Sequence, residues 1–385
     1  MMISPCTHYE KTGNTVARAL GEKLIASGNV ATCVLAGGQG SRMGIEIPKG
    51  SYPITPIRKK SLFQLIVEKV RACSKRVGRP LDIAFMTSPE NHSQSLAFFE
   101  QHDFFGCPQE QINFFTQSAL PLLSEEGHSP LMHDDSSPYL VADGNGSFFW
   151  EFCKSGLATG WAQKGIDTVI VIQVDNPLAD PFDAELVGVH TGRKNDATIM
   201  AIEKNSPDES VGLIVEKEGK LAIVEYSEMD TATKTAKNED GSLKFKLGNI
   251  SYFCFSLDFI RKISLMSKTK FPLHEALKIS PQLSFPAIKQ EYFIFDMLSE
   301  AEKASVLLAT REEVFAPLKN KEGQDSPVTA QALLRSRDRK LFEAISGNPV
   351  PPNITVELSC EFHYPTPSLI EKWKGKTLTR SGYVE

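Results

Sequence analysis

An apolar strand that runs directly into a glycine-rich loop is the feature that most constrains this chain. Residues 30–36 are almost all apolar, and the chain continues as Gly-Gly-Gln-Gly-Ser-Arg-Met-Gly. A continuous apolar strand is typical of a sheet that is covered on both faces. Glycine lets the backbone come close to a ligand, and the N–H groups of such a loop can surround phosphate oxygens. The pattern predicts an α/β fold with an anion-binding loop after its first long strand.

Two familiar phosphate-binding loops do not fit these residues. A Walker A loop ends in Gly-Lys followed by Ser or Thr, whereas this loop has Ser-Arg and no lysine at that point. The dinucleotide fingerprint GxGxxG begins at Gly38 and Gly40 but meets Met43 where its third glycine belongs. A plain tight turn is the simplest alternative for any glycine cluster. Arg42 and Lys49 favour phosphate binding, because they add two cations to the loop.

Strand and helix patterns alternate through the first half of the chain. Further apolar runs predict strands, and helical spacing of apolar residues predicts helices between them. The expected strands are 81–87, 111–116 and 168–174, and the expected helices are 5–27, 61–73, 89–99 and 147–157. Such alternation indicates parallel strands joined by right-handed crossovers, with helices on both faces of the sheet.

The pattern changes after residue 196, where short strands are joined by turn-rich segments. This texture predicts an antiparallel extension of the sheet. The expected strands are 197–203, 211–217, 221–225 and 250–255. We then expect a helix at 291–302, a strand at 305–309, a helix at 328–344 and a strand at 354–358.

Composition and charge exclude several classes of protein. Among the 385 residues, 42 Lys and Arg face 47 Asp and Glu, a net charge of −5, which leaves no basic surplus for gripping nucleic acid. No apolar run approaches the ~20 residues that span a bilayer, and no secretory signal pattern is present. Seven cysteines without a CxxC pair argue against a disulfide framework or a zinc ribbon. We expect a cytoplasmic protein that binds neither nucleic acid nor membranes.

Further short motifs follow the glycine loop in a fixed order over about three quarters of the chain. They lie at residues 36–44, 48–50, 114–117, 120–121, 143–146, 174–176, 211–212, 224–228, 248–250 and 315–320. Together they resemble the signature of the UDP-sugar pyrophosphorylases. The form Val-Glu-Tyr-Ser-Glu at 224–228 is most similar to the eukaryotic-type UDP-N-acetylglucosamine/galactosamine pyrophosphorylases.

The resemblance implies a fold, a division into domains and a reaction. The fold would be a Rossmann-like, GT-A-like nucleotidyltransferase with a mixed, mostly parallel sheet, helices on both faces and small terminal extensions. The domains would be an N-terminal helical segment (1–29), a catalytic domain (30–320) and a small C-terminal domain (321–385). The reaction would join UTP to an N-acetylhexosamine 1-phosphate by in-line attack on the UTP α-phosphorus, giving a UDP-sugar and pyrophosphate. Alternatives are glucose 1-phosphate as the substrate, or a catalytically silent nucleotide-sugar binding protein.

The same resemblance implies catalytic and metal-binding residues. Arg42 would hold the β- and γ-phosphates, Lys49 the α-phosphate, and Lys319 would reach the phosphates from the C-terminal side. Each could instead be an ordinary surface cation. Asp175 ends a predicted strand, and ligands of open α/β sheets bind at the carboxyl ends of strands. Asp175 is therefore our candidate for holding Mg²⁺, with a helix N-cap or turn residue ahead of Pro177 as the alternative and Asp143 as a rival carboxylate.

Nucleotide and sugar sites are also implied. The nucleotide-binding candidates are Leu35, Ala36, Gly37, Gly38, Gln117 and Gly144, and the sugar-binding candidates are Asn145, Gly212, Glu225 and Asn249. A glutamine amide can pair with the imide edge of uracil, and a carboxylate can accept hydrogen bonds from sugar hydroxyls. Asn249 could instead lie near the metal. The chain departs from the family at Thr116-Gln117-Ser118-Ala119, where relatives have two glutamines followed by Gly-Met. The oligomeric state stays open.

Overall fold

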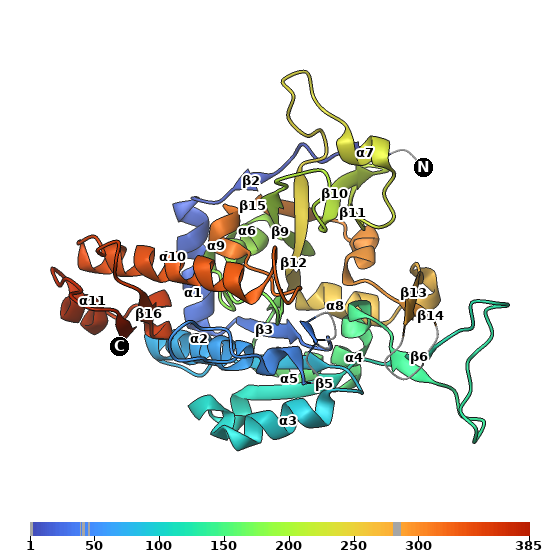
Figure 1. The fold of residues 1–385 in the computed structure, drawn as a ribbon, viewed down its shortest axis with the longest axis horizontal. Helices are drawn as coiled ribbons and strands as arrows, with labels where there is room; N and C mark the ends of the chain where they lie inside the picture. Colours follow the sequence, from blue (N-terminus) through green and yellow to red (C-terminus); the bar gives the residue numbers. More distant parts are fainter. Residues whose placement is uncertain (1–2, 39, 41–42, 45–46, 280–285) are drawn as a thin grey trace.

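A large mixed sheet forms the centre of the molecule (Figure 1). The structure is a computed structural model that describes residues 3–38, 40, 43–44, 47–279 and 286–385. Along the sheet the strands follow the order β2 (Glu10–Lys11), β15 (Ala304–Leu308), β9 (Ala197–Glu203), β12 (Leu247–Ser256), β8 (Thr168–Gln173), β3 (Val30–Leu35), β4 (Ile83–Thr87) and β5 (Ile112–Thr116). Only β12 runs antiparallel to its neighbours on this path, so the predicted mixed, mostly parallel sheet is confirmed.

An antiparallel group of short strands extends the sheet beside β12. It consists of β10 (Gly212–Lys217), β11 (Lys220–Val224) and β1 (Ile3–Pro5), with β10 paired to all three of its neighbours. The register places Gly212 of β10 opposite Asn249 of β12. The predicted antiparallel extension is confirmed, and it brings two sugar-site candidates together.

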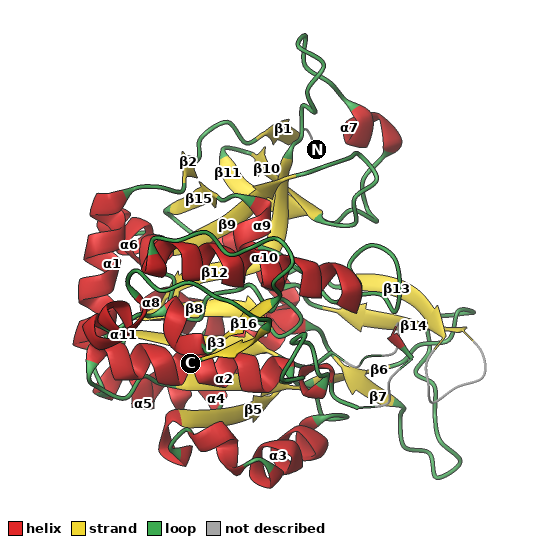
Figure 2. Ribbon diagram, turned by 60° about the vertical axis from the view of Figure 1, so that its left-hand side comes forward, coloured by secondary structure: helices red, strands yellow, loops and turns green. Residues whose placement is uncertain are grey.

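Helices cover both faces of the sheet, as the alternating pattern predicted (Figure 2). One face packs against α1 (Thr15–Ser27), α2 (Leu62–Val77) and α6 (Ala184–Arg193), and the other against α4 (Phe148–Lys154), α5 (Leu157–Gln163) and α8 (Leu257–Ser264). Strand β3 contributes to both cores, because successive side chains of a strand point to opposite faces. Val30 and Val34 belong to the first core, and Ala31, Cys33 and Leu35 to the second.

The remaining elements lie around this centre. They are α3 (His92–Gln101), α7 (Thr231–Thr235), α9 (Arg311–Val314), α10 (Pro327–Ser346), α11 (Pro367–Trp373), and the strand pairs β6 (Ala119–Pro121) with β7 (Leu140–Ala142), β13 (His274–Ile279) with β14 (Pro286–Glu291), and β16 (Val356–Leu358) with β17 (Gly382–Val384). A separate apolar cluster around Phe342 and Phe362 underlies the C-terminal segment. The division at residue 321 stays a prediction. In the described part of the chain, no helix has the length and apolar character that crossing a bilayer requires.

The helix expected at 291–302 is wrong. Strand β14 ends at Glu291 and a 3₁₀ helix spans Ile294–Glu300. The N–H of Tyr292 donates to the carbonyl of Asp143 (2.8 Å), and the N–H of Ile294 donates to the side chain of Asn145 (2.9 Å). Hydrogen bonds to a loop that is distant in sequence thus keep the backbone extended ahead of Ile294, which prevents an α-helix from starting at residue 291.

Two other helix boundaries also differ from expectation. Helix α1 begins at Thr15 rather than residue 5, because β1 and β2 pair with sheet strands and Asn14 caps the helix through the N–H of Ala17. The helix expected at 147–157 corresponds to α4 and ends at Lys154. Gly156, in the left-handed conformation, separates it from α5, a further helix that the sequence pattern did not predict.

Helices α1 and α6 pack with their backbones in contact. A Cβ atom placed on Gly21 of α1 would lie 1.7 Å from the carbonyl oxygen of Ala184, and one on Gly188 of α6 would lie 1.7 Å from that of Ala17. No side chain larger than hydrogen fits at either position. This contact fixes the N-terminal helix against the body of the protein.

We predict that Gly188→Ala lowers the free energy of unfolding by about 1–3 kcal/mol, because the added methyl group forces the two helices apart. The matched control is Gly192→Ala in the same helix, where the new Cβ would meet only Leu20 at 3.5 Å. That change should raise stability by up to about 1 kcal/mol through helix propensity. Urea unfolding of both variants measures the difference, and equal effects would contradict the close contact.

Candidate active site

Lys49 and Asp175 form an ion pair at the carboxyl edge of the sheet. Lys49 begins the 3₁₀ helix Lys49–Ser51, and its Nζ lies 3.0 Å from Oδ2 of Asp175, just beyond β8. The two side chains are only 16% and 20% exposed. Strands β3 and β8 pair in parallel with Leu35 opposite Gln173, so Asp175 and the glycine loop leave the sheet side by side. The two residues that the sequence assigned to phosphate and metal are therefore in direct contact.

A cavity of about 260 Å³ opens beside this ion pair. Five residues predicted for the site line it, namely Asp175, Gly212, Glu225, Asn249 and Lys319. Its remaining lining residues are Gln173, Ser210, Val211, Tyr226, Ile250, Ser251 and Phe315. Sequence analysis did not single out Tyr226 and Phe315, although both belong to motifs it quoted. An aromatic ring inside a motif was the signal that could have identified them.

Gly212 and Asn249 form the floor of the cavity. The side-chain oxygen of Asn249 accepts a hydrogen bond from the N–H of Ser251 (3.0 Å), which leaves its NH₂ group as the donor for a ligand. Gly212 has little space for a side chain, since a Cβ there would lie 3.0 Å from Ile223. The register of β12 against β9 shifts after Asn249, and this irregularity lies beside the cavity.

Glu225 and Lys319 give the cavity its charges. Burial raises the pKa of the Glu225 carboxyl, while the hydrogen bond from the N–H of Tyr226 (3.2 Å) and the charge of Lys319 act in the opposite direction. The Lys319 ammonium group donates to the carbonyl of Ser210 (3.3 Å) and lies 5.7 Å from the centre of the Phe315 ring. A carboxylate and an ammonium group thus line the same cavity.

The glycine loop after β3 is held by a buried side chain that sequence analysis missed. The amide nitrogen of Asn91 donates to the carbonyl of Ala36 (2.9 Å), and the N–H of Ala36 donates to the carbonyl of Met86 (2.7 Å). The side chain of Gln117 lies against Gly37, where a Cβ would be 2.5 Å from its Oε1 atom. The predicted nucleotide residues Leu35, Ala36, Gly37, Gly38 and Gln117 therefore form one neighbourhood. Arg42 lies outside the described residues.

The loop that carries Gly144 and Asn145 packs against Tyr292. Gly144 has a φ of +93°, and a Cβ there would lie 2.4 Å from the carbonyl oxygen of Tyr292, so only glycine fits. The side-chain oxygen of Asn145 accepts from the N–H of Ile294. Asn145 is not among the residues that line the 260 Å³ cavity, and its sugar-binding role stays a prediction.

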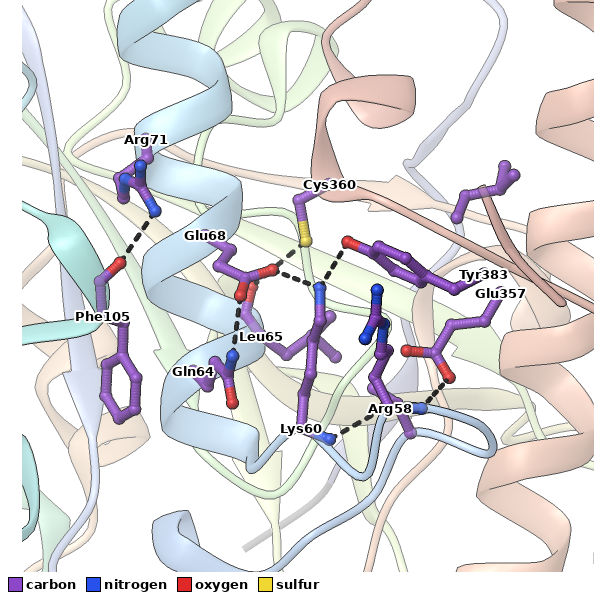
Figure 3. Close-up of polar contacts among 12 residues, drawn as sticks. Arg58, Lys60, Gln64, Leu65, Glu68, Arg71, Phe105, Glu357, Cys360 and Tyr383 are labelled. Atoms are coloured by element: carbon purple, nitrogen blue, oxygen red, sulfur yellow. Dashed lines mark hydrogen bonds and ion pairs between the residues drawn. The ribbon is translucent and has the colours of Figure 1, made fainter. Parts of the chain in front are cut away.

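The C-terminal segment holds the far end of the loop that carries Lys49 (Figure 3). The Nζ atom of Lys60 donates to Glu68 (2.6 Å) on α2 and to the hydroxyl of Tyr383 (2.8 Å) on β17. The buried Glu357 carboxylate of β16 accepts hydrogen bonds from the backbone N–H groups of Ile57 (2.6 Å) and Arg58 (2.9 Å). Figure 3 shows these side chains converging between α2 and the end of the chain. A segment with no residue in the site therefore fixes one of its loops.

The metal-binding potential of the site depends on one carboxylate. In the described ranges no group of three or more His, Cys, Asp or Glu side chains has a metal-binding arrangement. Asp175 alone still suits Mg²⁺, which commonly takes one or two protein carboxylates and completes its shell with substrate phosphates and water. Its donor set therefore fits a metal that arrives with a phosphate ligand.

The chain is similar to known proteins over most of its length. Residues 9–363 match the family described as UTP–glucose-1-phosphate uridylyltransferase. The UDP-N-acetylglucosamine pyrophosphorylase of Saccharomyces cerevisiae is 33% identical over 406 residues, covering 99% of this chain and 84% of that protein. The UDP-N-acetylglucosamine diphosphorylase 2 of Arabidopsis thaliana is 33% identical, covering 82% of this chain and 66% of its own length. A crystal structure of an Entamoeba histolytica protein superimposes with a TM-score of 0.85 at 25% identity, covering 100% of both chains.

We predict that Glu225→Gln makes the protein more stable at pH 7.5 and that the gain fades toward pH 4. Because burial raises the pKa of Glu225, its charge penalises the folded state above that pKa, and the penalty vanishes below the ordinary value of 4.5. Melting temperatures at the two pH values measure the effect. Glu239→Gln, at an exposed position, is the control and should show no pH-dependent difference. A loss of stability at pH 7.5 would contradict the prediction.

Proposed function

The chain belongs to the UTP–glucose-1-phosphate uridylyltransferase family, and we propose that it forms UDP-N-acetylglucosamine and pyrophosphate from UTP and N-acetylglucosamine 1-phosphate. The observation that carries the proposal is the ion pair between Lys49 and Asp175 beside a cavity lined by Glu225, Asn249 and Lys319. The names of the yeast and Arabidopsis relatives support the choice of an N-acetylhexosamine over glucose. The galactosamine epimer is the nearest alternative sugar.

The reaction needs positioning and charge stabilisation rather than a covalent enzyme intermediate. A phosphate oxygen of the sugar phosphate attacks the α-phosphorus of UTP, the new P–O bond forms, and the bond to the β-phosphate oxygen breaks as pyrophosphate leaves. Lys49 places a positive charge where negative charge develops on the α-phosphate. Lys319, which lines the cavity together with Asp175, would neutralise phosphate charge. Arg42 is proposed to hold the β- and γ-phosphates through its planar fork.

Mg²⁺ is the proposed cofactor, with Asp175 as its protein ligand. When bound, the metal would neutralise phosphate charge and favour the in-line arrangement of attacking and leaving oxygens. In the absence of substrate, Lys49 neutralises the Asp175 carboxylate. Asp175 would hold the metal in place of Lys49, and the Lys49 ammonium group would then be free to contact phosphate.

Nucleotide and sugar recognition are proposed for opposite sides of this ion pair. Leu35, Ala36, Gly37, Gly38, Gln117 and Gly144 would bind the nucleotide, with the Gln117 amide pairing with uracil. Glu225, Gly212, Asn249 and Asn145 would bind the sugar. We also propose that the fold is the GT-A-like form of the Rossmann-like nucleotidyltransferases. All seven cysteines are free, which supports a cytoplasmic location.

Pyrophosphate release tests the function directly. The protein would be mixed with UTP, Mg²⁺ and the 1-phosphate of N-acetylglucosamine, N-acetylgalactosamine, glucose or galactose, with an EDTA arm for the metal. We expect release with N-acetylglucosamine 1-phosphate and its loss in EDTA. Release with glucose 1-phosphate alone would keep the reaction and overturn the sugar assignment. Binding of a UDP-sugar without release in any arm would identify a silent binding protein.

We predict that Lys49→Ala lowers kcat by about 10²–10³-fold, the usual loss when one group that stabilises transition-state charge is removed. The melting temperature should fall as well, because the Asp175 carboxylate, which is only 20% exposed, loses its partner, so kcat is measured at a temperature where the variant is folded. Lys59→Gln is the matched control, since Lys59 is an exposed cation of the same loop and should leave kcat unchanged. A kcat within twofold of the unaltered protein would place charge stabilisation elsewhere.

A further inference from the structure

His274 lies between two carboxylates at the start of β13. Its Nδ1 atom is 2.5 Å from Oε1 of Glu228, and its Nε2 atom is 2.9 Å from Oδ2 of Asp296. The side chain is 14% exposed, and its ring packs on the ring of Phe293 with centroids 4.4 Å apart. Only the doubly protonated imidazolium can donate from both nitrogens at once. The geometry therefore selects a charged histidine that joins two acidic side chains.

Each of the two carboxylates belongs to a segment that holds a residue proposed for sugar binding, and these two segments are here named the two walls of the proposed sugar site. Glu228 lies three residues after Glu225 in the same motif, and the Glu228 N–H donates to the carbonyl of Glu225 (3.1 Å). Asp296 belongs to the 3₁₀ helix that starts at Ile294, whose N–H holds the side chain of Asn145. His274 thus connects the wall that carries Glu225 to the wall that holds Asn145.

Electrostatics favours the charged form of this histidine. Burial opposes the charge, but the hydrogen bonds and negative charges of Asp296 and Glu228 outweigh it and raise the pKa of His274 to about 9. The positive charge in turn partly offsets the rise that burial causes in the pKa of Glu225. Across the strand pair, His274 also faces Glu291, which is bonded to Lys289 at 3.0 Å. At neutral pH His274 is therefore a cation that is held between the carboxylates of Glu228 and Asp296.

We propose that His274, together with Glu228 and Asp296, is a positioning residue that sets the distance between the two walls of the sugar site. The three side chains, here named the histidine clasp, touch no reacting atom. They fix the loop that carries Glu225 relative to the segment that supports Asn145, and so they determine how well the sugar fits. The inference rests on the proposed function, because it assigns the sugar to the space between these walls.

The clasp predicts a selective loss of sugar affinity. In His274→Gln the KM for N-acetylglucosamine 1-phosphate should rise about tenfold or more, since two charge-assisted hydrogen bonds are lost. The KM for UTP should change much less, because the proposed nucleotide residues other than Gly144 lie on other elements. His128→Gln is the matched control, as His128 also pairs with a carboxylate (Glu275, 3.3 Å) but lies on the exposed surface. It should leave both KM values unchanged.

The pH profile separates positioning from a merely structural role. Below pH 9 the clasp is intact, and as the pH rises through about 9 the imidazolium loses its proton. The unaltered protein should therefore show a rise in the sugar-phosphate KM between pH 7.5 and 9.5, and His274→Gln should lack this rise. Asp296→Asn should raise the KM for the sugar phosphate but not that for UTP. In the double variant with His274→Gln, the rise in the sugar-phosphate KM should be smaller than the two single effects combined.

The outcomes distinguish the clasp from the function on which it rests. If the unaltered protein releases pyrophosphate but His274→Gln changes both KM values alike, or keeps the pH-dependent rise, the clasp is overturned and the function stands. If the unaltered protein is inactive, calorimetric titration with UDP-N-acetylglucosamine and UTP replaces the kinetic readout. A selective loss of UDP-sugar affinity in His274→Gln would then support the clasp. Absence of any binding would overturn both proposals.

Discussion

The parallel pairing of β3 with β8 is the constraint on which the site depends. It brings the glycine loop and Asp175 to the same edge of the sheet, and Lys49 closes the gap with an ion pair. A mostly buried pair of this kind gives little net stability, because desolvation offsets its attraction. In the proposed reaction, a phosphate would replace Asp175 as the partner of Lys49, and the metal would replace Lys49 as the partner of Asp175.

The buried charged groups of the site each lie near a group of opposite charge. Burial raises the pKa of the Glu225 carboxyl, and the nearby positive charges of Lys319 and His274 partly offset that rise. Charged groups outside the cavity also hold the site in place. The Glu357 carboxylate and the Tyr383 hydroxyl of the C-terminal segment bond to Ile57 and Lys60, and so fix the loop that carries Lys49. The site is thus assembled by charged contacts between segments that are distant in sequence.

Residue patterns predicted most of the central fold. Buried strands such as β3, β4 and β8 were recognisable because both faces of a covered sheet demand apolar residues. The helix expected at 291–302 was wrong because its apolar residues also suit a strand end and a 3₁₀ helix. The deciding hydrogen bonds come from Asp143 and Asn145, about 150 positions earlier. His274 and Asn91 escaped notice for a related reason, since their partners are defined only after folding.

The sequence by itself determined the α/β class, the glycine loop and the family motifs, because periodicity and local residue types are properties of the chain alone. Only the tertiary structure decided which motif residues share a cavity. Asp175, Glu225 and Lys319 line it together, whereas Asn145 does not line it and accepts a hydrogen bond from the N–H of Ile294. It also decided that Lys49 meets Asp175 and that His274 joins Glu228 to Asp296. These contacts depend on strand order and register, which arise from the packing of the whole sheet.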